Sequence, residues 1–231
     1  MTKIPLLDID GTLLKAGSKV HVEAYAVAIN QVFNTTLLAE HIDIHSFQGM
    51  TDSGVLVLLA EKLGIPTTTA LQKLPEMIHI ATHYFLENYH NPCDRFPGVL
   101  HLLRFLRQKK VPIGIVTGNI EKIARRRIQR ASLGEIAGGG FGDVSQNRVD
   151  LVYAAQKNIS QHLGRNIPLE NFVIIGDTVK DFECAEKAGV PAILVVNGSG
   201  REKELRATGA EFVLTSFEGS CARIKNFLFG H

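Results

Sequence analysis

Residues 6–14 read Leu-Leu-Asp-Ile-Asp-Gly-Thr-Leu-Leu, an apolar run that ends on two carboxylates and a glycine. In an extended strand the side chains alternate between faces, so Asp8 and Asp10 would project the same way at the strand's C-terminal end. Two like charges side by side repel, so the pair makes sense where a divalent cation lies between them or one carboxyl holds a proton. Both are circumstances of catalysis. A surface turn that uses Asp and Gly for local hydrogen bonds is the alternative for this stretch taken alone.

The composition is that of a globular protein. The 231 residues are 45% hydrophobic and 21% charged, enough for a sizeable core in one or two domains. A net charge of +2 without a basic block gives no reason to expect a nucleic-acid partner. The apolar run Val55 to Ala60 is too short to span a bilayer, and the N-terminus lacks the features of a signal peptide. We therefore expect a cytoplasmic protein with no membrane partner. The three widely spaced cysteines fit neither a disulfide framework nor a zinc site and are expected to be reduced.

Short apolar runs alternate with amphipathic segments along most of the chain. The expected strands are residues 6–9, 113–117, 172–176, 192–196 and 211–214. Helices are expected at residues 99–109, 120–131, 151–163 and 202–207, and one more follows residues 172–176 and ends at residue 188. Continuous apolar strands that alternate with helices indicate a parallel sheet covered on both faces. The predicted fold is α/β, a doubly wound parallel sheet.

One block interrupts this alternation. Residues 15–91 contain three helical patterns, at residues 22–33, 55–63 and 71–89, and no strand pattern. Phe96-Pro97-Gly98 then returns the chain to the earlier rhythm. We therefore predict a catalytic core made of residues 1–14 and 92–231, with residues 15–91 inserted as a helical cap.

Polar clusters follow three of the predicted strands. Besides Asp8 and Asp10, Thr117-Gly118-Asn119 follows residues 113–117, and Asp177 and Asp181 follow residues 172–176. Ligands of open parallel sheets bind beyond the C-terminal ends of the strands. Each cluster alone is as readily a helix cap or a turn. Together they suit phosphoryl transfer, in which a carboxylate attacks phosphorus while Mg²⁺, N–H groups, a hydroxyl and a basic side chain hold the oxygens.

These motifs resemble those of the haloacid dehalogenase-like hydrolases. The family has an Asp-x-Asp-Gly-Thr strand end, a Ser or Thr strand end, a Lys or Arg, and a Gly-Asp-x-x-x-Asp strand end. The resemblance covers the whole chain, and residues 15–91 stand where that family inserts an α-helical cap. Within the family, the phosphoglycolate-phosphatase-like group is the nearest resemblance.

The resemblance assigns two roles to the first motif. It implies that Asp8 is the nucleophile that becomes phosphorylated and a ligand of Mg²⁺. It implies that Asp10 is the general acid/base, which protonates the leaving alcohol and then activates water, and that its backbone carbonyl binds the metal. The dehalogenase branch lacks a carboxylate at the position of Asp10, so dehalogenation is not expected.

The other strand ends receive supporting roles from the same resemblance. Thr117 would hydrogen-bond the phosphate, and Gly118 and Asn119 would offer N–H groups at a helix start, where anions bind favourably. Asp177 would ligate Mg²⁺ directly. Asp181 would ligate it or orient its waters.

The third motif leaves a choice between two cations. Many family members have a Lys followed by Pro, whereas residues 145–151 read Ser-Gln-Asn-Arg-Val-Asp-Leu. Arg148, just ahead of the helix expected at 151–163, is the preferred candidate for catalysis and phosphate binding. Lys157 is the alternative, but it lies about two turns into that helix and is expected to face solvent. Arg is always charged and can grip two oxygens at once.

The resulting expectation is a Mg²⁺-dependent phosphomonoesterase whose partner is a small phosphorylated metabolite. Two alternatives stay open: a phosphosugar mutase built on the same core, and a non-catalytic binding or regulatory protein with this fold. The sequence chooses neither the substrate nor the oligomeric state.

Four further segments receive no catalytic role from these motifs. Arg125-Arg126-Arg127 is expected to be a solvated helix face, and residues 138–142 do not form a dinucleotide fingerprint. The turn at residues 49–52 could face the active site, although Thr51 and Asp52 would equally serve as helix caps. Lys180 could approach the phosphate or lie on the surface.

Overall fold

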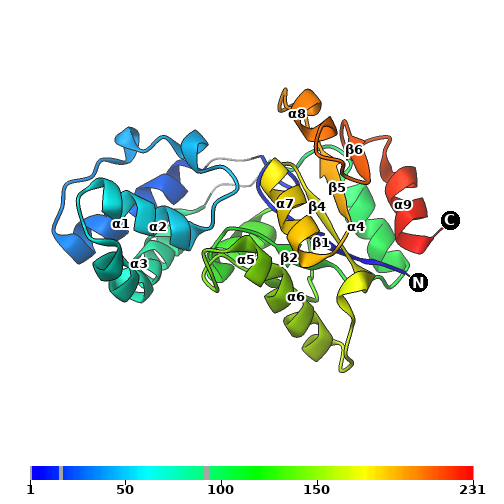
Figure 1. Cartoon of the computed structure of the whole chain (residues 1–231), viewed down its shortest axis with the longest axis horizontal. Coiled ribbons are helices and arrows are strands. Elements are labelled where there is room, and N and C mark those ends of the chain that lie inside the picture. Colours follow the sequence, from blue (N-terminus) through cyan, green and yellow to red (C-terminus); the bar gives the residue numbers. More distant parts are fainter. Residues whose placement is uncertain (1, 16–17, 91–93, 231) are drawn as a thin grey trace.

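The computed structural model describes residues 2–15, 18–90 and 94–230. A helical block lies beside a larger part built on a twisted sheet (Figure 1). The sheet has six strands, all parallel, in the order β3-β2-β1-β4-β5-β6. The strands are β1 (Ile4–Leu7), β2 (Gly114–Val116), β3 (Gly138–Gly140), β4 (Phe172–Gly176), β5 (Ala192–Val195) and β6 (Phe212–Leu214). The predicted α/β fold with a doubly wound parallel sheet is confirmed.

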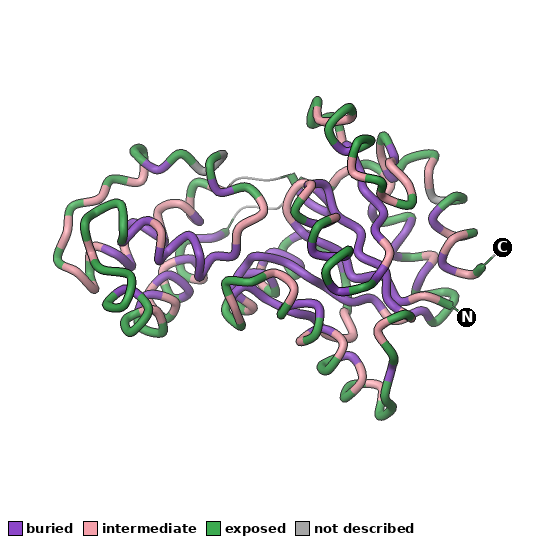
Figure 2. Tube along the Cα trace, viewed as in Figure 1, coloured by how far each residue is buried: buried purple, intermediate pink, exposed green. Residues whose placement is uncertain are grey.

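Helices cover both faces of this sheet, so its strands form the most buried layer of the larger part (Figure 2). One face packs against α4 (Val99–Gln108), α5 (Glu121–Arg130) and α9 (Cys221–Phe229). The other face packs against α6 (Arg148–His162) and α7 (Val179–Ala188). The alternation is visible in β1, where Leu7 belongs to the first apolar cluster and Leu6 to the second. Both faces of β1 are buried, which explains its unbroken apolar sequence.

The helical block has an apolar cluster of its own. Its helices are α1 (Lys19–Phe33), η1 (Ala39–His41), η2 (Ile44–Phe47), α2 (Asp52–Lys62) and α3 (Thr67–Asn88). Ile120 and Ile123, at the start of α5, also belong to this cluster, so the block packs on the larger part through side chains of α5. The boundary predicted between residues 91 and 92 lies outside the described residues, and the division into core and cap stays a prediction.

The remaining elements are short. They are η3 (Leu169–Asn171) before β4 and α8 (Glu202–Arg206) between β5 and β6. Leu205 of α8 packs with Leu194 of β5 in a small cluster near the end of the sheet. Asn197, in the loop between β5 and α8, donates hydrogen bonds to the carbonyls of Gly11 and Thr12, so this loop lies beside the one that follows β1.

Several elements differ from the sequence prediction, and three of them, β1, β3 and α9, shape the sheet and its cover. β1 ends at Leu7 rather than Ile9, so Asp8 and Asp10 lie in the loop beyond the strand and do not extend it. β3 consists of three glycines, which carry no side-chain periodicity and are depleted in strands, and the prediction missed it. The prediction also missed α9, whose buried Ile224 and Leu228 close one face of the sheet.

Two expectations drawn from composition concern the whole chain. Among the described residues, no helix combines the length and the apolar character that crossing a membrane requires. Cys184 has a free thiol and is buried on α7. Cys93 lies outside the described residues, and the side chain of Cys221 is not described.

Candidate active site

Asp8 is a buried carboxylate at the centre of the sheet's C-terminal edge. It follows β1, at the point where the strand order reverses between β1 and β4. Its Oδ1 accepts a hydrogen bond from the Ile9 N–H at 2.8 Å, and its Oδ2 lies 3.7 Å from Nη2 of Arg148. Burial, and then the nearby charge of Asp181, raise the pKa of Asp8 well above its ordinary value. Without a further cation, the site therefore resists ionisation of this side chain.

Asp177 lies directly after β4, the strand next to β1. Its Oδ1 accepts a hydrogen bond from Oγ1 of Thr12 at 3.1 Å, and its Oδ2 from Nη2 of Arg201 at 2.6 Å. Burial and the charge of Asp181 raise the pKa of Asp177 to about 7. Gly11 makes this position possible, because a Cβ there would overlap the Asp177 carboxylate.

Asp181 serves the fold and the site at once. Its Oδ2 accepts hydrogen bonds from the N–H and the hydroxyl of Thr178, at 3.0 and 2.6 Å, and Thr178 in turn accepts from the Asp181 N–H. This reciprocal pair is a capping box at the start of α7. The Oδ1 of Asp181 accepts a hydrogen bond from Arg148. Asp181 is thus held in place from both of its oxygens.

Three of the predicted metal ligands form a compact oxygen cluster. One carboxylate oxygen from each of Asp8, Asp177 and Asp181 lies within 4.8 Å of the others, and all three residues are buried. Hard oxygen donors that carry excess negative charge suit Mg²⁺. The side chain of Asp10 is not a member of this cluster, and a contribution of its backbone carbonyl to the metal stays a prediction.

The carboxylate of Asp10 contacts residues outside the oxygen cluster. Both of its oxygens accept hydrogen bonds from Arg127, Oδ2 from Nη1 at 2.5 Å and Oδ1 from Nη2 at 2.6 Å. Asn119 also donates Nδ2 to Oδ2 of Asp10 at 2.8 Å. Burial acts to raise the pKa of Asp10, but the charge and hydrogen bonds of Arg127, with that of Asn119, outweigh burial and lower it.

The prediction of a solvated face at Arg125-Arg126-Arg127 was therefore wrong for its last residue. The side chain of Arg127 is only 3% exposed. It follows Ile120 and Ile123 by seven and four residues, and this spacing places it on the buried face of α5. The spacing was a signal in the sequence that could have identified Arg127.

Thr117 and Asn119 follow β2, the other neighbour of β1. Both are buried, and Nδ2 of Asn119 donates to Oγ1 of Thr117 at 3.0 Å. The Asn119 N–H also points to Thr117, with 3.4 Å between N and Oγ1. The carbonyl of Gly118 accepts a hydrogen bond from the Asp52 N–H of the helical block at 2.7 Å. The end of β2 thus links Thr117, which is predicted to hold the phosphate, to the acid/base candidate Asp10 and to the helical block.

Arg148, and not Lys157, lies at the carboxylates. Arg148 is the first residue of α6, where Asn147 caps the helix by accepting from the Val149 N–H at 3.2 Å. Burial acts to lower the pKa of Arg148, but the charges of Asp181 and Asp8 outweigh it and raise the pKa. Lys157 is exposed on the same helix, and so it makes no part of this cluster.

A cavity of about 500 Å³ opens on these groups. Both parts of the molecule line it: the sheet edge provides Asp8, Asp10 and Thr117, and the helical block provides Tyr25, Phe47 and Met50. The rest of its lining mixes apolar side chains, such as Phe47 and Val55, with polar ones, such as Lys15 and Gln48. The cavity can therefore hold a charged group at the sheet edge, with the rest of the same molecule against the helical block.

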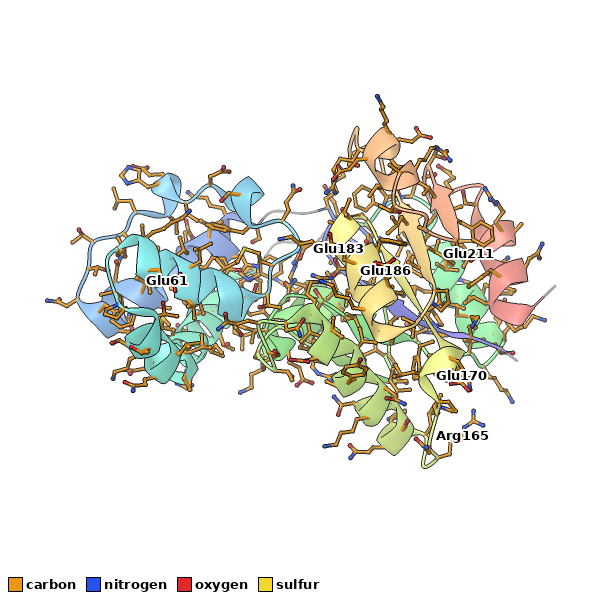
Figure 3. All side chains as sticks on the ribbon, in the orientation of Figure 1. Glu61, Arg165, Glu170, Glu183, Glu186 and Glu211 are labelled. Atoms are coloured by element: carbon orange, nitrogen blue, oxygen red, sulfur yellow. The ribbon has the colours of Figure 1, made fainter. Side chains whose placement is uncertain are left out.

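A second cavity, of about 420 Å³, lies between the helical block and α7. Glu61 of α2 and Glu183 of α7 are among its lining residues (Figure 3). Lys180 also lines this second cavity and is exposed, so the structure gives it no contact with Asp8. Arg148 lines both cavities.

The turn at residues 49–52 connects the helical block to the sheet edge. Thr51 caps α2 by accepting from the Gly54 N–H, as its position before the helix predicted. Asp52 accepts hydrogen bonds from Tyr25 Oη at 2.6 Å and from the Ile120 N–H at 2.8 Å, and its Oδ2 lies 3.1 Å from Nε2 of His21. Gly49 and Asp52 line the larger cavity, yet the Asp52 carboxylate is engaged by protein groups.

Arg201 and Asn197 also lie at the site, although no sequence motif pointed to them. Besides Asp177, Arg201 donates Nη1 to Gln48 Oε1 of the helical block at 3.2 Å. Asn197 donates Nδ2 to the carbonyls of Gly11 and Thr12 at 2.9 and 3.1 Å and so holds the loop after β1. Both follow β5, a strand end that carries no carboxylate motif.

The chain is similar in structure to several solved proteins of this fold. A hydrolase from Pseudomonas syringae superposes with a TM-score of 0.68 at 22% identity, over 97% of this chain and 98% of that one. A protein from Lactobacillus delbrueckii subsp. bulgaricus, provisionally named a phosphoglycolate phosphatase, gives 0.66 at 21% identity over 100% of both chains. A β-phosphoglucomutase from Clostridium difficile gives 0.68 at 16% identity, over 100% and 98%. At these identities the likeness shows the fold.

Curated proteins contain no match to the sequence. The family model of the haloacid dehalogenase-like hydrolases matches residues 2–189, which include the loop after β1, the end of β2, the start of α6 and the end of β4. Those are the segments that the structure gathers around the larger cavity. By this match, the chain belongs to the haloacid dehalogenase-like hydrolases.

Proposed function

We propose that the protein is a Mg²⁺-dependent phosphomonoesterase that hydrolyses a small phosphorylated metabolite through a phosphorylated Asp8. The observation that carries the proposal is the position of Asp8. Its buried carboxylate opens on a cavity of about 500 Å³ and lies beside the guanidinium of Arg148. Thr117 lines the same cavity. A nucleophile, a cation and a hydroxyl that converge on one space suit a phosphoryl group.

The oxygen cluster of Asp8, Asp177 and Asp181 would hold the metal. Its donor set fits Mg²⁺, since all three donors are carboxylate oxygens within 4.8 Å of one another. When bound, Mg²⁺ supplies positive charge that stabilises the oxygens of the transferring group. Arg148 and Arg201 already offset part of the negative charge of these carboxylates.

The reaction would proceed in two steps on this chain's own groups. A carboxylate oxygen of Asp8 attacks phosphorus, the bond from phosphorus to the leaving oxygen breaks, and Asp10 in its protonated form donates its proton to that oxygen. Because the contact with Arg127 favours the ionised form, one of its two bonds must open before Asp10 carries this proton. Asp10, now ionised, takes a proton from water, which attacks the same phosphorus and releases phosphate and free Asp8. Thr117 and Arg148 hold the phosphoryl oxygens in both steps.

Residues 15–91 would act as the cap that selects the substrate. Tyr25, Phe47 and Met50 line the cavity from the helical block, so they would contact the part of the substrate that leaves. The cytoplasmic location and the lack of nucleic-acid and membrane partners stay predictions.

A phosphosugar mutase is the second candidate, because it would use the same groups to return the phosphoryl group to its product. The observation in its favour is that both parts of the molecule wall the cavity, which would let a released product stay bound and turn. A bisphosphate-dependent isomerisation assay on hexose phosphates separates the two activities.

The proposed function is tested by assaying the purified protein with Mg²⁺ against a broad panel of phosphorylated metabolites. We expect phosphate release from at least one of them, and its loss with EDTA. Asp8→Asn should reduce turnover to the background rate with the fold intact by circular dichroism, because the amide cannot act as the nucleophile. Asp94→Asn, a change on the exposed surface, is the matched control and should keep full activity.

Two results would contradict the proposal. Substantial phosphatase activity in Asp8→Asn would remove Asp8 as the nucleophile. Failure of the wild-type protein to hydrolyse any ester of the panel would favour a binding or regulatory protein on this fold.

A further inference from the structure

We propose that the second cavity, between the helical block and α7, is the route by which inorganic phosphate leaves the active site. The inference rests on the proposed function, since phosphate is the product that hydrolysis of a phosphorylated Asp8 releases. The two products would then leave separately, the alcohol through the larger cavity and phosphate through the second one. The wall that the cavities share, the helix faces of the second cavity and its charges all support this route.

The two cavities share part of their walls. Gly49, Met50 and Arg148 line both the cavity of about 500 Å³ and the one of about 420 Å³. Nη2 of Arg148 lies 3.7 Å from Oδ2 of Asp8, so the shared wall reaches the proposed nucleophile. Met50 is only partly buried, and its unbranched side chain can change rotamer without a movement of the backbone. A rotation of Met50 would therefore open a passage between the two cavities beside Arg148.

The second cavity leads from solvent to Arg148 between two helix faces. Residues spaced by three, four and seven positions line it on each helix: Gly54, Val57, Leu58 and Glu61 of α2, and Lys180, Glu183, Cys184 and Lys187 of α7. This spacing places each set on one face of its helix. Glu61 and Glu183 mark the two helices in Figure 3. The side chain of Arg148 is 9% exposed, whereas Glu61 and Lys187 are exposed, so the cavity has an inner end at the active site and an outer end in solvent.

The charges of the second cavity suit an anion better than those of the larger cavity. Its charged lining residues are Arg148, Lys180 and Lys187 on the positive side, and Glu61 and Glu183 on the negative side. Carboxylates outnumber cations in the larger cavity, which is lined by Asp8, Asp10, Asp52 and Asp177 together with Lys15, Arg148 and Arg201. The stem of Lys180 also packs on the shared wall, because a Cβ at Gly49 would lie 2.6 Å from its Cδ. An anionic product therefore meets less negative charge along α7 than along the larger cavity.

Oxygen exchange between phosphate and water measures phosphate entry without any alcohol. In the reverse of the hydrolytic step, an oxygen of Asp8 attacks the phosphorus of inorganic phosphate and the bond to one phosphate oxygen breaks. That oxygen leaves as water once it regains the proton that Asp10 had taken. Attack by a new water then returns free phosphate, so phosphate labelled with ¹⁸O loses its label to unlabelled water. At low phosphate concentration this loss depends on phosphate entry, whereas hydrolysis of an ester depends on entry through the larger cavity.

Two opposite charge changes on α7 test the route, because Glu183 and Lys187 line the second cavity and not the larger one. Lys187→Glu should lower the exchange rate at low salt by about three- to tenfold, and Glu183→Lys should raise it. In both variants, kcat/KM for the ester that the wild-type protein hydrolyses best should change by less than about twofold. Lys157→Glu, the same charge change at an exposed position of α6 that lines neither cavity, is the matched control and should leave both rates unchanged.

A bulky side chain in the second cavity should act in the same direction as Lys187→Glu. Leu58→Trp places an indole among the residues that line this cavity, so the exchange rate should fall while kcat/KM for the ester stays unchanged. Leu100→Trp, at an exposed leucine of α4 that lines neither cavity, is the matched control. Thermal unfolding checks that each variant folds. If Leu58→Trp does not fold, the two charge changes on α7 carry the test.

The outcomes distinguish the route from the proposed function. Equal changes in exchange and in ester hydrolysis, or no change in exchange, would show that phosphate uses the larger cavity and overturn the route while leaving the phosphatase intact. If the wild-type protein hydrolyses esters without measurable exchange, the association rate of orthovanadate, a phosphate analogue, takes its place in the same comparison. That rate is measured from the onset of inhibition after rapid mixing. A wild-type protein that hydrolyses no ester overturns the proposed function, and this inference with it.

Discussion

The carboxylates at the sheet edge are kept close together by glycine at position 11. Gly11 has φ of +74°, and a Cβ there would overlap the carboxylate of Asp177. A larger residue would have to push Asp177 away from Thr12 and from the oxygen cluster. The ability of this site to gather three carboxylates thus depends on a residue without a side chain.

Gly11→Ala should therefore abolish most activity and weaken the binding of Mg²⁺. Gly64→Ala is the matched control, because Gly64 also has positive φ, +82°, but no atom lies within 4 Å of its added Cβ. Both variants should lose about 1–2 kcal/mol of stability from backbone strain. Only Gly11→Ala should lose the rise in melting temperature that Mg²⁺ gives the wild-type protein, measured by thermal unfolding with and without the metal. Equal responses to Mg²⁺ in the two variants would contradict the role given to Gly11.

Residues of the site differ in how far the sequence could predict them. Asp8, Asp10 and Asp177 follow apolar strands, so their convergence followed from the rule that parallel strands end at one edge. Arg201 follows β5 without any motif, and only the path of the loop before α8 brings it to Asp177. The order of residue types does not indicate the path of a loop, so the position of Arg201 at the site could be seen only in the structure.

At the scale of elements, the helical block and α5 are joined by polar contacts as well as apolar ones. Asp52 at the start of α2 accepts from Tyr25 of α1 and from the Ile120 N–H ahead of α5. Burial, and then the charge of Asp52, raise the pKa of Tyr25 well above its ordinary value, so the phenol stays a neutral donor. Three elements are therefore held through one buried carboxylate.

Removal of the Tyr25 hydroxyl tests the contact that Asp52 makes between the helical block and α5. Tyr25→Phe leaves Oδ1 of Asp52 without a hydrogen-bond donor among the described residues and should cost about 1–3 kcal/mol of stability. In a chain of this length that is a fall of roughly 2–12 °C in melting temperature. Tyr84→Phe is the matched control, since Tyr84 makes only a 3.3 Å contact with Glu23, and it should shift the transition by a degree or two at most. Calorimetry measures the melting temperature of each variant. A melting temperature unchanged in Tyr25→Phe would contradict a stabilising role for the contact between Tyr25 and Asp52.

The elements that could be predicted from the sequence are those whose apolar side chains form a recognisable pattern of buried positions. β4 has five apolar or small residues in a row, and its predicted bounds agree with the structure. β3 has three glycines and offered no pattern, although it completes the sheet by pairing with β2. Element ends were less well predicted, as β1 shows, because the backbone leaves the strand at Leu7 while the apolar run continues to Ile9.

At the scale of the whole molecule, the oxygen cluster makes stability depend on pH and on the metal. An unfolded Asp has a pKa of about 3.9, whereas that of Asp177 in the fold is raised to about 7. Between these values the unfolded chain releases a proton that the folded chain keeps, so the stability of the metal-free protein falls as pH rises from about 4 to about 7. Asp8 acts in the same direction.

Thermal unfolding in EDTA across this pH range measures the effect. We expect the melting temperature of the wild-type protein to fall toward pH 7 by an amount that reflects roughly a few kcal/mol at most. Asp177→Asn should flatten the fall, because the amide does not ionise, while Asp94→Asn on the surface should leave it unchanged. Mg²⁺ should restore more stability at pH 7.5 than at pH 5, since it binds the ionised carboxylates. A steeper pH dependence in Asp177→Asn would contradict the assignment.

The glycine strand β3 bears on the site from a distance. α6 packs so closely on it that a Cβ at Gly140 would overlap the carbonyl of Leu151, and Arg148 lies one helical turn before that residue. The location of the Arg148 guanidinium therefore depends on a strand whose three residues carry no side chain. A methyl group added at Gly140 would act as a spacer that shifts α6 outward and carries the guanidinium away from Asp8. A wider separation between the backbones of β3 and α6 would thus lower the activity, although no catalytic side chain is substituted.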